Sequence, residues 1–406
     1  MTDVLNVWAD GRHVGVFSRV NGSTRFEYDA DATSPISLSL PIGDGESSAA
    51  EAFLQGLLPE GEVARLRMRH GLGAASTDSF DLLDSVDSAG GLVFSSSSAD
   101  PEASEALVPM QPEDLEALCA SVAGSGAAWW EADKRMRFSL AGAQGKFTAT
   151  WLSGDWYWPS ASLPSTHIFK PESARIADVA YVECACMRLA SRCGLATPQS
   201  TVARLAGTSV YVVERFDREA SGDGVARLRT EDLCQALGVM PSEKYEVSMG
   251  DVIGLLRRSG VPSDEVYSWV TMVGFNVLVG NADAHAKNYS LYETDAGPRL
   301  CPLYGCVTTS YWDGFDRALA MSVNGKWYPE EIGLDDWARE AQADGLDPER
   351  VRSSVRDLAA RIVEETPLAM EGLPKGVAFR LGPLITRLPR LLVPGEVPRD
   401  PGETTR

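Results

Sequence analysis

The chain has 406 residues, of which 44% are hydrophobic and 23% are charged, a composition typical of a globular protein with room for two or three domains. With 37 lysines and arginines against 57 aspartates and glutamates, its net charge of −20 argues against direct, sequence-independent binding to nucleic acid phosphates. The first residues lack the basic start and apolar core of a signal peptide, and no apolar run approaches membrane-spanning length, so we expect a cytoplasmic protein without membrane contact.

The amino-terminal part is predicted to combine a small sheet with helices. Apolar and polar residues alternate on both sides of Asp10-Gly11 and again around Asn21-Gly22, and such dipeptides are strong signals for β-hairpins. The pattern then becomes helical over residues 53–68 and, briefly, over residues 80–84. The serine run at 95–98 and the small polar residues after it predict an exposed connection, near which we place the end of the first domain.

The middle of the chain is predicted to be β-rich with one main helix. This helix is expected between Ile176 and Cys193, followed by Gly194, a residue type that commonly ends helices. Its apolar stripe consists of Val179, Val182, Cys186 and Leu189.

The seven cysteines mostly occupy apolar, helix-like surroundings, which predicts buried thiols in a reducing compartment. Cys184, Cys186 and Cys193 lie close together in the sequence. No second pair of Cys or His residues has zinc-like spacing, however, so we expect no zinc site.

From about residue 219 the sequence is predicted to be helical. Thr230 is expected to cap a helix beginning at Glu231, and another helix is expected to start at Asp251. Asp347-Pro348 combines an N-cap with proline at the first helical position. The buried face of that helix is predicted to consist of Val351, Val355, Leu358 and Ile362.

These patterns divide the chain into four parts of an α+β protein. They are a domain over residues 1–98, a β-rich part over 106–218, a helical part over 219–394 and a tail over 395–406. Proline, glycine and charge dominate the tail, which we expect to be frayed.

Several polar groups follow the apolar helix whose face is Val266, Val270, Val273 and Val277. Gly280 is expected to end this helix. Asp283, His285, Lys287 and Asn288 then occur within six positions. An Asp followed five residues later by an Asn is the arrangement of protein kinases, in which the Asp accepts the proton of the substrate hydroxyl and the Asn holds magnesium. The alternative is a solvated loop whose Asp and Asn make turn hydrogen bonds.

Five segments in this order resemble motifs of the HipA family of serine/threonine kinases, which supplies the toxins of bacterial toxin–antitoxin pairs. The segments are residues 138–146, 167–172, 212–218, 231–238 and 280–288. The resemblance extends from about residue 3 to about residue 393. It implies a two-lobed, protein-kinase-like α+β fold with a smaller amino-terminal α+β domain docked on it.

The resemblance also implies roles for individual residues. Asp283 is expected to be the catalytic base, Asn288 a magnesium ligand and Lys287 a support for the transferring phosphate. His285 is expected to organise the loop by hydrogen bonding. Lys170, at the end of a predicted strand, is expected to clamp ATP phosphates. The simpler interpretation of Lys170 is a surface lysine.

Glu183 is the expected ion-pair partner of Lys170, although a carboxylate at the edge of the helical stripe could also be solvated. At the predicted hinge, the resemblance assigns adenine binding to the backbone of Glu214 and Phe216 and places Asp217 near the ribose. The alternative for the hinge is a strand that leaves the sheet onto a charged turn.

A glycine-rich loop is expected to approach the phosphates through Gly142, Ala143 and Gln144. A single Gly-x-x-Gly motif is more often a turn, but this one precedes a strand lysine and a helix glutamate. The resemblance identifies Ser139 as the serine whose autophosphorylation switches the enzyme off. Family members often carry an acidic residue where Gly145 stands.

One position departs from the family pattern. Gly305 stands where the family has the metal-binding aspartate, and a glycine provides no carboxylate for magnesium. Three explanations remain open: an introduced inactivating change, a natural pseudokinase, or replacement of the carboxylate by Asp313 or Asp316.

The sequence therefore predicts an ATP- and Mg²⁺-dependent protein serine/threonine kinase that acts as a toxin. Its activity is in question because of Gly305. The resemblance implies a HipB-like helix-turn-helix antitoxin as partner, DNA contact only through that antitoxin, and a substrate such as an aminoacyl-tRNA synthetase. The alternative is a catalytically inactive, nucleotide-binding module that acts in the antitoxin or repressor complex.

Overall fold

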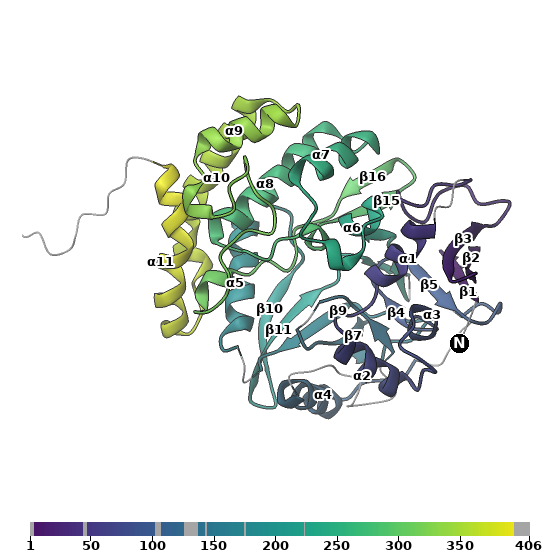
Figure 1. Cartoon of the computed structure of the whole chain (residues 1–406). Coiled ribbons are helices and arrows are strands. Elements are labelled where there is room, and N and C mark those ends of the chain that lie inside the picture. Colours follow the sequence, from purple (N-terminus) through teal and green to yellow (C-terminus); the bar gives the residue numbers. More distant parts are fainter. Residues whose placement is uncertain are drawn as a thin grey trace, which may run out of the picture.

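The computed structural model describes residues 4–43, 47–101, 107–125, 137–142, 144–173, 176–222 and 224–393. The tail predicted to be frayed lies outside these ranges. Figure 1 shows the chain as an amino-terminal domain, a β-rich lobe and a helical lobe packed against one another.

The amino-terminal domain contains an antiparallel sheet with the strand order β3-β2-β1-β5. Its strands are β1 (Val4–Ala9), β2 (Arg12–Val20), β3 (Ser23–Tyr28) and β5 (Leu92–Ser95). Both predicted hairpins are confirmed. Asp10 and Gly11 have φ of 52° and 70°, and Asn21 and Gly22 have φ of 52° and 81°, as tight two-residue hairpin turns require.

The described part of this domain also contains the helices α1 (Ser47–Gly56), α2 (Glu62–Leu72) and α3 (Ser79–Leu82). The prediction of one helical pattern over residues 53–68 was wrong, because the chain breaks between α1 and α2. Pro59 cannot donate the helical hydrogen bond, and Gly61 adopts φ of 88°. The loop between these two helices reaches the functional site.

The β-rich lobe is built on a sheet with the strand order β10-β11-β9-β7-β8. Its strands are β7 (Phe147–Leu152), β8 (Asp155–Tyr157), β9 (His167–Pro171), β10 (Ser200–Leu205) and β11 (Thr208–Glu214). Two short strands, β4 (Asp87–Ser88) and β6 (Phe138–Ser139), pair in parallel and join this lobe to the amino-terminal domain.

Two helices cover opposite faces of this sheet. Tyr211 and Val213 of β11 pack into the core that includes α5 (Val179–Arg192), whereas Val210 and Val212 face the core that includes α4 (Pro112–Ser125). The main helix predicted to begin at Ile176 is confirmed as α5, which begins at Val179. The prediction of one main helix missed α4, which is as long as α5 and presents Leu115, Leu118, Cys119 and Val122 at helical spacing to the sheet.

The helical lobe surrounds α8, whose residues Trp269 and Phe275 are fully buried. Its helices are α6 (Leu233–Leu237), α7 (Met249–Arg258), α8 (Ser263–Val279), α9 (Leu334–Ala343), α10 (Pro348–Ala369) and α11 (Lys375–Leu392). It also contains the hairpin β12 (Arg218–Ser221) and β13 (Gly224–Arg227), and a sheet of β14 (Thr230–Asp232), β15 (Ser290–Thr294) and β16 (Gly297–Leu300).

The caps of these helices are partly as predicted. Asp347 caps α10 by accepting hydrogen bonds from the N–H groups of Glu349 and Arg350. Thr230 is not a cap, because it lies in β14, and Asp232 instead forms a capping box with Gln235. Asp251 lies inside the first turn of α7, which Ser248 caps.

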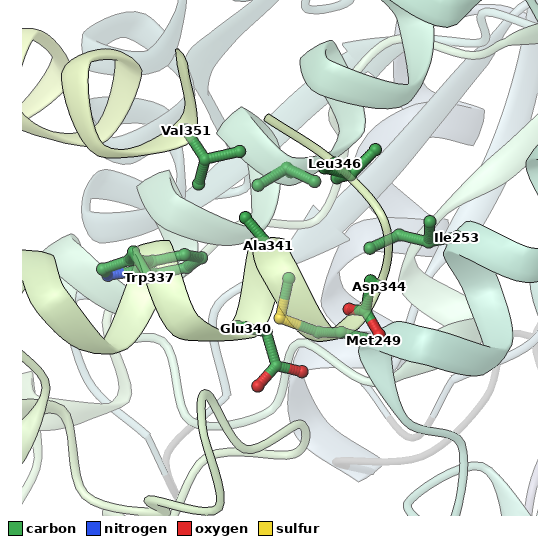
Figure 2. Close-up of a pocket in the computed structure, with 9 residues that line it drawn as sticks. Met249, Ile253, Trp337, Glu340, Ala341, Asp344, Leu346 and Val351 are labelled. Atoms are coloured by element: carbon green, nitrogen blue, oxygen red, sulfur yellow. The ribbon is translucent and has the colours of Figure 1, made fainter. Parts of the chain in front are cut away.

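At one edge of the helical lobe, α9 packs against α7. There Trp337 and Ala341 of α9 lie near Met249 and Ile253 of α7, around a small and largely apolar pocket that Asp344 also lines (Figure 2). All seven cysteines are buried and unpaired, as predicted. Within the described ranges, no helix combines the length and the apolar character that a membrane span needs.

The amino-terminal domain is docked on the rest of the chain by polar contacts. Glu231 accepts hydrogen bonds from the hydroxyl of Ser37 and the N–H of Leu38, and it is only 2% exposed. Gln235 donates to the carbonyl of Phe53. Since buried polar groups are costly when unpaired, these contacts specify one docking position.

Candidate active site

A cavity of about 590 Å³ lies where the three parts of the chain meet. Almost all the predicted site residues in the described part of the chain line it. They are Gly142, Gln144, Lys170, Glu183, Glu214, Phe216, Asp217, Asp283, His285, Lys287, Asn288 and Gly305. Ser139 does not line the cavity, and Ala143 lies outside the described residues.

The loop that carries Asp283 is fixed by the end of α8. Gly280 adopts φ of 75° and ends the helix as predicted, donating its N–H to the last helical turn. The amide of Asn281 donates to the side chain of Asn276, which in turn donates to the hydroxyl of Tyr289. This buried network makes the loop a rigid platform.

Asp283 and Asn288 lie at opposite ends of this loop and are in contact. The side-chain amide of Asn288 donates to the main-chain carbonyl of Asp283 at 2.8 Å. The carboxylate of Asp283 is 60% exposed and accepts a hydrogen bond of 2.6 Å from the hydroxyl of Tyr245. An exposed carboxylate at a cavity wall is able to accept a proton from a bound hydroxyl.

His285 is buried, with 5% of its surface exposed. Burial and the nearby Lys244 ammonium lower the pKa of its imidazole to about 3, so the ring is neutral at physiological pH. Its ring packs edge-on against that of Tyr245, with 5.1 Å between centroids. A ring with so low a pKa is a poor proton acceptor, which argues against a catalytic role. Its Nδ1 is buried without a hydrogen-bond partner, and the hydrogen bonds of His285 found among the described residues are those of its main chain, whose N–H donates to the carbonyl of Asp283 and whose carbonyl accepts from the N–H of Asn288. The predicted organising role of the side chain by hydrogen bonding is therefore not supported.

Lys287 contributes to the cavity wall, but its ammonium already has two partners. It lies 2.6 Å from Oδ2 of Asp232 and donates a hydrogen bond of 2.9 Å to the carbonyl of Gly56. A phosphate group would therefore compete with Asp232 for this charge. The predicted phosphate contact of Lys287 remains a prediction.

Lys170 and Glu183 form the expected ion pair, with 2.6 Å between Nζ and Oε1. Lys170 lies on β9, Glu183 lies on α5, and Glu183 is 3% exposed. The alternatives of a free surface lysine and a solvated glutamate are therefore wrong. The pair holds one ammonium at the cavity wall, where it is available to an anion.

The glycine-rich segment also contributes a cation that the sequence analysis did not single out. The ammonium of Lys146 donates to the carbonyls of Ala141 and Gly142 at 2.7 and 3.4 Å. Burial and the nearby Lys170 lower the pKa of Lys146 to about 7. The sequence did contain a signal for this role, because Lys146 directly follows the second glycine of the Gly-x-x-Gly motif.

Ser139 is completely buried on β6, and its hydroxyl donates to the carbonyl of Leu57 at 2.7 Å. Any modification of this hydroxyl would first require Ser139 to become exposed and its hydrogen bond to Leu57 to break. Autophosphorylation of Ser139 therefore remains a prediction.

The predicted hinge lies along the cavity, but Asp217 has a different environment from the one expected. Its carboxylate accepts hydrogen bonds from Arg215 at 2.7 and 2.9 Å and from the N–H of Gly90 at 2.8 Å. Burial alone would raise the pKa of Asp217, yet Arg215 and Arg218 hold it below its usual range. These partners argue against the predicted ribose contact and instead give Asp217 the role of tying the hinge to the amino-terminal domain.

Phe216 packs its ring against Tyr304, with 5.0 Å between centroids, and its carbonyl accepts a hydrogen bond from Tyr292. Glu214 ends β11 beside it, and its side chain is 56% exposed. The segment thus combines a fixed backbone with an aromatic wall. Such a wall suits a flat, partly apolar ligand such as a purine.

Gly305 is exposed at the cavity with φ of 61°, and a Cβ there would have no atom within 4 Å. The described residues contain no group of three or more His, Cys, Asp or Glu side chains able to hold a metal ion. Asp313 and Asp316 do not line the cavity, so replacement of the missing carboxylate by either residue is not supported. The side chains present do not form a magnesium site.

Comparisons with known proteins find similarity to HipA-type proteins over almost the whole chain. The HipA N-terminal domain matches residues 5–94, and the HipA-like C-terminal domain matches residues 138–366. The putative kinase Y4mE of Sinorhizobium fredii is 35% identical over 395 residues, which cover 89% of this chain and 92% of that protein.

Two further comparisons concern Shewanella oneidensis. Its serine/threonine-protein kinase toxin HipA is 29% identical over 351 residues, covering 81% of this chain and 79% of that toxin. A chain from the solved complex of its HipA, HipB and operator DNA is similar with a TM-score of 0.83 and 25% identity, covering 96% of this chain and 97% of that chain. The chain therefore has the two-domain HipA fold and belongs to the HipA family of kinases.

Proposed function

We propose that this chain binds ATP in the 590 Å³ cavity and is a HipA-like protein serine/threonine kinase, the toxin of a toxin–antitoxin pair. The observation that carries the proposal is the Lys170–Glu183 pair, which shares this cavity with Asp283 and Asn288. A phosphate clamp, an ion-paired helix carboxylate and a loop Asp with an Asn are the parts of a phosphoryl-transfer site.

The cavity suits a nucleotide in its size and in its distribution of groups. The aromatic wall and hinge at Phe216 would receive the adenine, and the ammonium groups of Lys170 and Lys146 would receive the phosphates. Lys146 has only carbonyl partners among the described residues, so an anionic phosphate would strengthen its charged form.

In the transfer step, the oxygen of a serine or threonine hydroxyl would attack the terminal phosphorus of ATP. Asp283 would accept the hydroxyl proton as the bond from phosphorus to the leaving oxygen of ADP breaks. The Asp283 carboxylate is suited to this because it is exposed to the cavity and fixed in position.

Without a carboxylate at position 305, the protein as it stands should transfer phosphate slowly. We expect Gly305→Asp to raise the rate of ATP-dependent phosphorylation of Ser139 or of a serine peptide by at least about a thousandfold. An aspartate fits because the site is open and because aspartate tolerates positive φ better than most residues.

Gly305→Asn is the matched control, since it adds the same shape without the charge and should leave the rate near that of the parent. Radiolabelled ATP and mass spectrometry of the product measure both rates. Equal rates for the parent and for Gly305→Asp would contradict the proposed role of this position. If neither the parent nor Gly305→Asp transferred phosphate, the result would contradict the kinase proposal.

A second candidate function follows from Gly305 alone. The chain would then be a nucleotide-binding pseudokinase that acts through its antitoxin complex. Nucleotide binding without transfer, together with retained antitoxin binding, would favour this alternative.

For partners, we propose a HipB-like helix-turn-helix antitoxin, because the similar Shewanella oneidensis HipA was solved with HipB and operator DNA. Contact with DNA would be indirect, consistent with a net charge of −20. A substrate such as an aminoacyl-tRNA synthetase, and inactivation by autophosphorylation of Ser139, rest on the family resemblance alone.

A further inference from the structure

The Asp283 carboxylate is held by one side chain from outside its own loop. Tyr245 donates its hydroxyl to Oδ1 of Asp283 at 2.6 Å. The main chain of Asp283 is fixed separately, since its carbonyl accepts from Asn288 and its N–H donates to Asn281. Among the described residues, no other hydrogen bond to the carboxylate is found, and Nε2 of His285 lies 3.9 Å from the same oxygen. Tyr245 is therefore the side chain that most directly orients the carboxylate.

Tyr245 is itself fixed from two sides. Its ring meets the edge of the buried His285 ring, and the ammonium of Lys244 lies 5.2 Å from its centroid. Lys244 in turn pairs with Glu60, at 2.6 Å between Nζ and Oε2. Glu60 belongs to the loop between α1 and α2, so the phenol lies between the catalytic loop and the amino-terminal domain.

This hydrogen bond does not block the carboxylate. An ionised carboxylate has about four acceptor positions on two oxygens, and Tyr245 uses one of them. Oδ2 has no hydrogen-bond partner among the described residues. The contact therefore orients Asp283 and leaves one oxygen for the proton of an acceptor hydroxyl.

We propose that Tyr245 is a positioning residue for phosphoryl transfer, whose hydroxyl holds Asp283 with Oδ2 directed to the acceptor site. The proposal rests on the proposed function, in which Asp283 is the base. Tyr245 lies in the segment before α7, so the proposal adds this segment to a site formed by the catalytic loop, the hinge and the glycine-rich segment. Burial, together with the Asp283 carboxylate, raises the pKa of the Tyr245 phenol, as a hydrogen bond from this hydroxyl to a carboxylate requires.

The kinetic test uses the Gly305→Asp protein as parent. Tyr245→Phe removes only the hydroxyl and should lower kcat roughly tenfold, while the KM for ATP and the affinity for adenosine stay unchanged. Tyr328→Phe is the matched control, because Tyr328 is 45% exposed and lies outside the cavity, and it should leave kcat unchanged.

A double-mutant cycle separates positioning from a general structural effect. In an Asp283→Asn background, Tyr245→Phe should change the residual rate by less than twofold, because the group that Tyr245 orients is gone. An unchanged kcat in Tyr245→Phe, or an equal loss with and without Asp283, would overturn the proposal.

A second measurement does not depend on activity. With ¹³C-labelled tyrosine, the Tyr245 resonance, identified by its loss in Tyr245→Phe, should remain that of a neutral phenol up to about pH 10.5. In Asp283→Asn the phenol should ionise at a lower pH than in the parent, because the carboxylate that raises its pKa is gone, although burial still raises it. Ionisation at the same pH in both proteins would overturn the contact even if no phosphate transfer were detected, so a failure of this proposal is distinguishable from a failure of the kinase proposal.

Discussion

The ammonium of Lys287 donates a hydrogen bond of 2.9 Å to the carbonyl of Gly56, a residue 231 positions earlier in the chain. The carbonyl of the next residue, Leu57, accepts the hydroxyl of Ser139. The carboxyl end of α1 carries partial negative charge, which suits a lysine ammonium. Two successive carbonyls of the amino-terminal domain thus hold the catalytic loop and the segment that carries Ser139.

Adenosine should bind the protein and its Gly305→Asp variant with affinities within about twofold of each other, because the hinge at Glu214 and Phe216 lies apart from the phosphate end of the cavity. ATP with magnesium should bind the protein as it stands roughly tenfold more weakly than the variant, a difference of about 1.4 kcal/mol. Calorimetric titration of both ligands provides the comparison. If adenosine binds neither form, the hinge assignment is wrong.

The Lys170–Glu183 pair should affect stability and nucleotide binding separately. Lys170→Met leaves the nearly buried Glu183 carboxylate without its partner and should lower the free energy of unfolding by roughly 3 kcal/mol. The double variant Lys170→Met/Glu183→Met should recover most of this loss, since two apolar side chains replace the charges.

The double variant should nevertheless bind ATP poorly while retaining adenosine, because the phosphate clamp is absent. Urea unfolding and calorimetry measure the two effects. Wild-type affinity for ATP in the double variant would show that Lys170 does not contact phosphate.

Asp344 should make stability depend on pH. Burial is the main cause that raises the pKa of Asp344 to about 6, and the negative charges of Glu340 and Asp251 add to it. Asp344 lies beside Met249 and Ile253 (Figure 2). A raised pKa means that the folded state holds the proton more tightly. The stabilisation is therefore present below the unfolded pKa near 4 and is lost as the pH rises through about 6.

Asp344→Asn should consequently raise the free energy of unfolding by roughly 1 kcal/mol at pH 8, a value reduced for partial solvent exposure, and by much less at pH 4.5. Asp357→Asn on α10, whose side chain is 56% exposed, is the control and should show no such pH dependence. Thermal unfolding across this pH range tests the prediction, and an equal effect at both pH values would contradict it.

The chain alone should not bind duplex DNA with useful affinity in about 150 mM salt. Proteins that hold DNA unaided neutralise many phosphates, whereas this chain has a net charge of −20. Association should appear when a small helix-turn-helix partner is added. Gel-shift titrations with and without that partner test this, and tight binding by the chain alone would refute it.

Local patterns were sufficient for much of the fold. The hairpins at Asp10-Gly11 and Asn21-Gly22 depend on neighbouring residues, and so does the end of α8 at Gly280. The helix α4 was missed although its apolar residues had helical spacing, so the signal was present. The break between α1 and α2 was also signalled, by Pro59 and Gly61.

The sequence by itself determined the family motifs, the order of the elements and the missing carboxylate at Gly305, because each of these is a property of residues close together in the chain. Only the tertiary structure decided which distant groups meet. It paired Lys287 with Asp232, enclosed Asp217 between arginines and placed Tyr245 on Asp283. Such contacts depend on how separate elements pack. A hydrogen bond needs its donor and acceptor within about 3 Å, and for residues far apart in the chain this distance is determined by the whole fold and not by their spacing in the sequence.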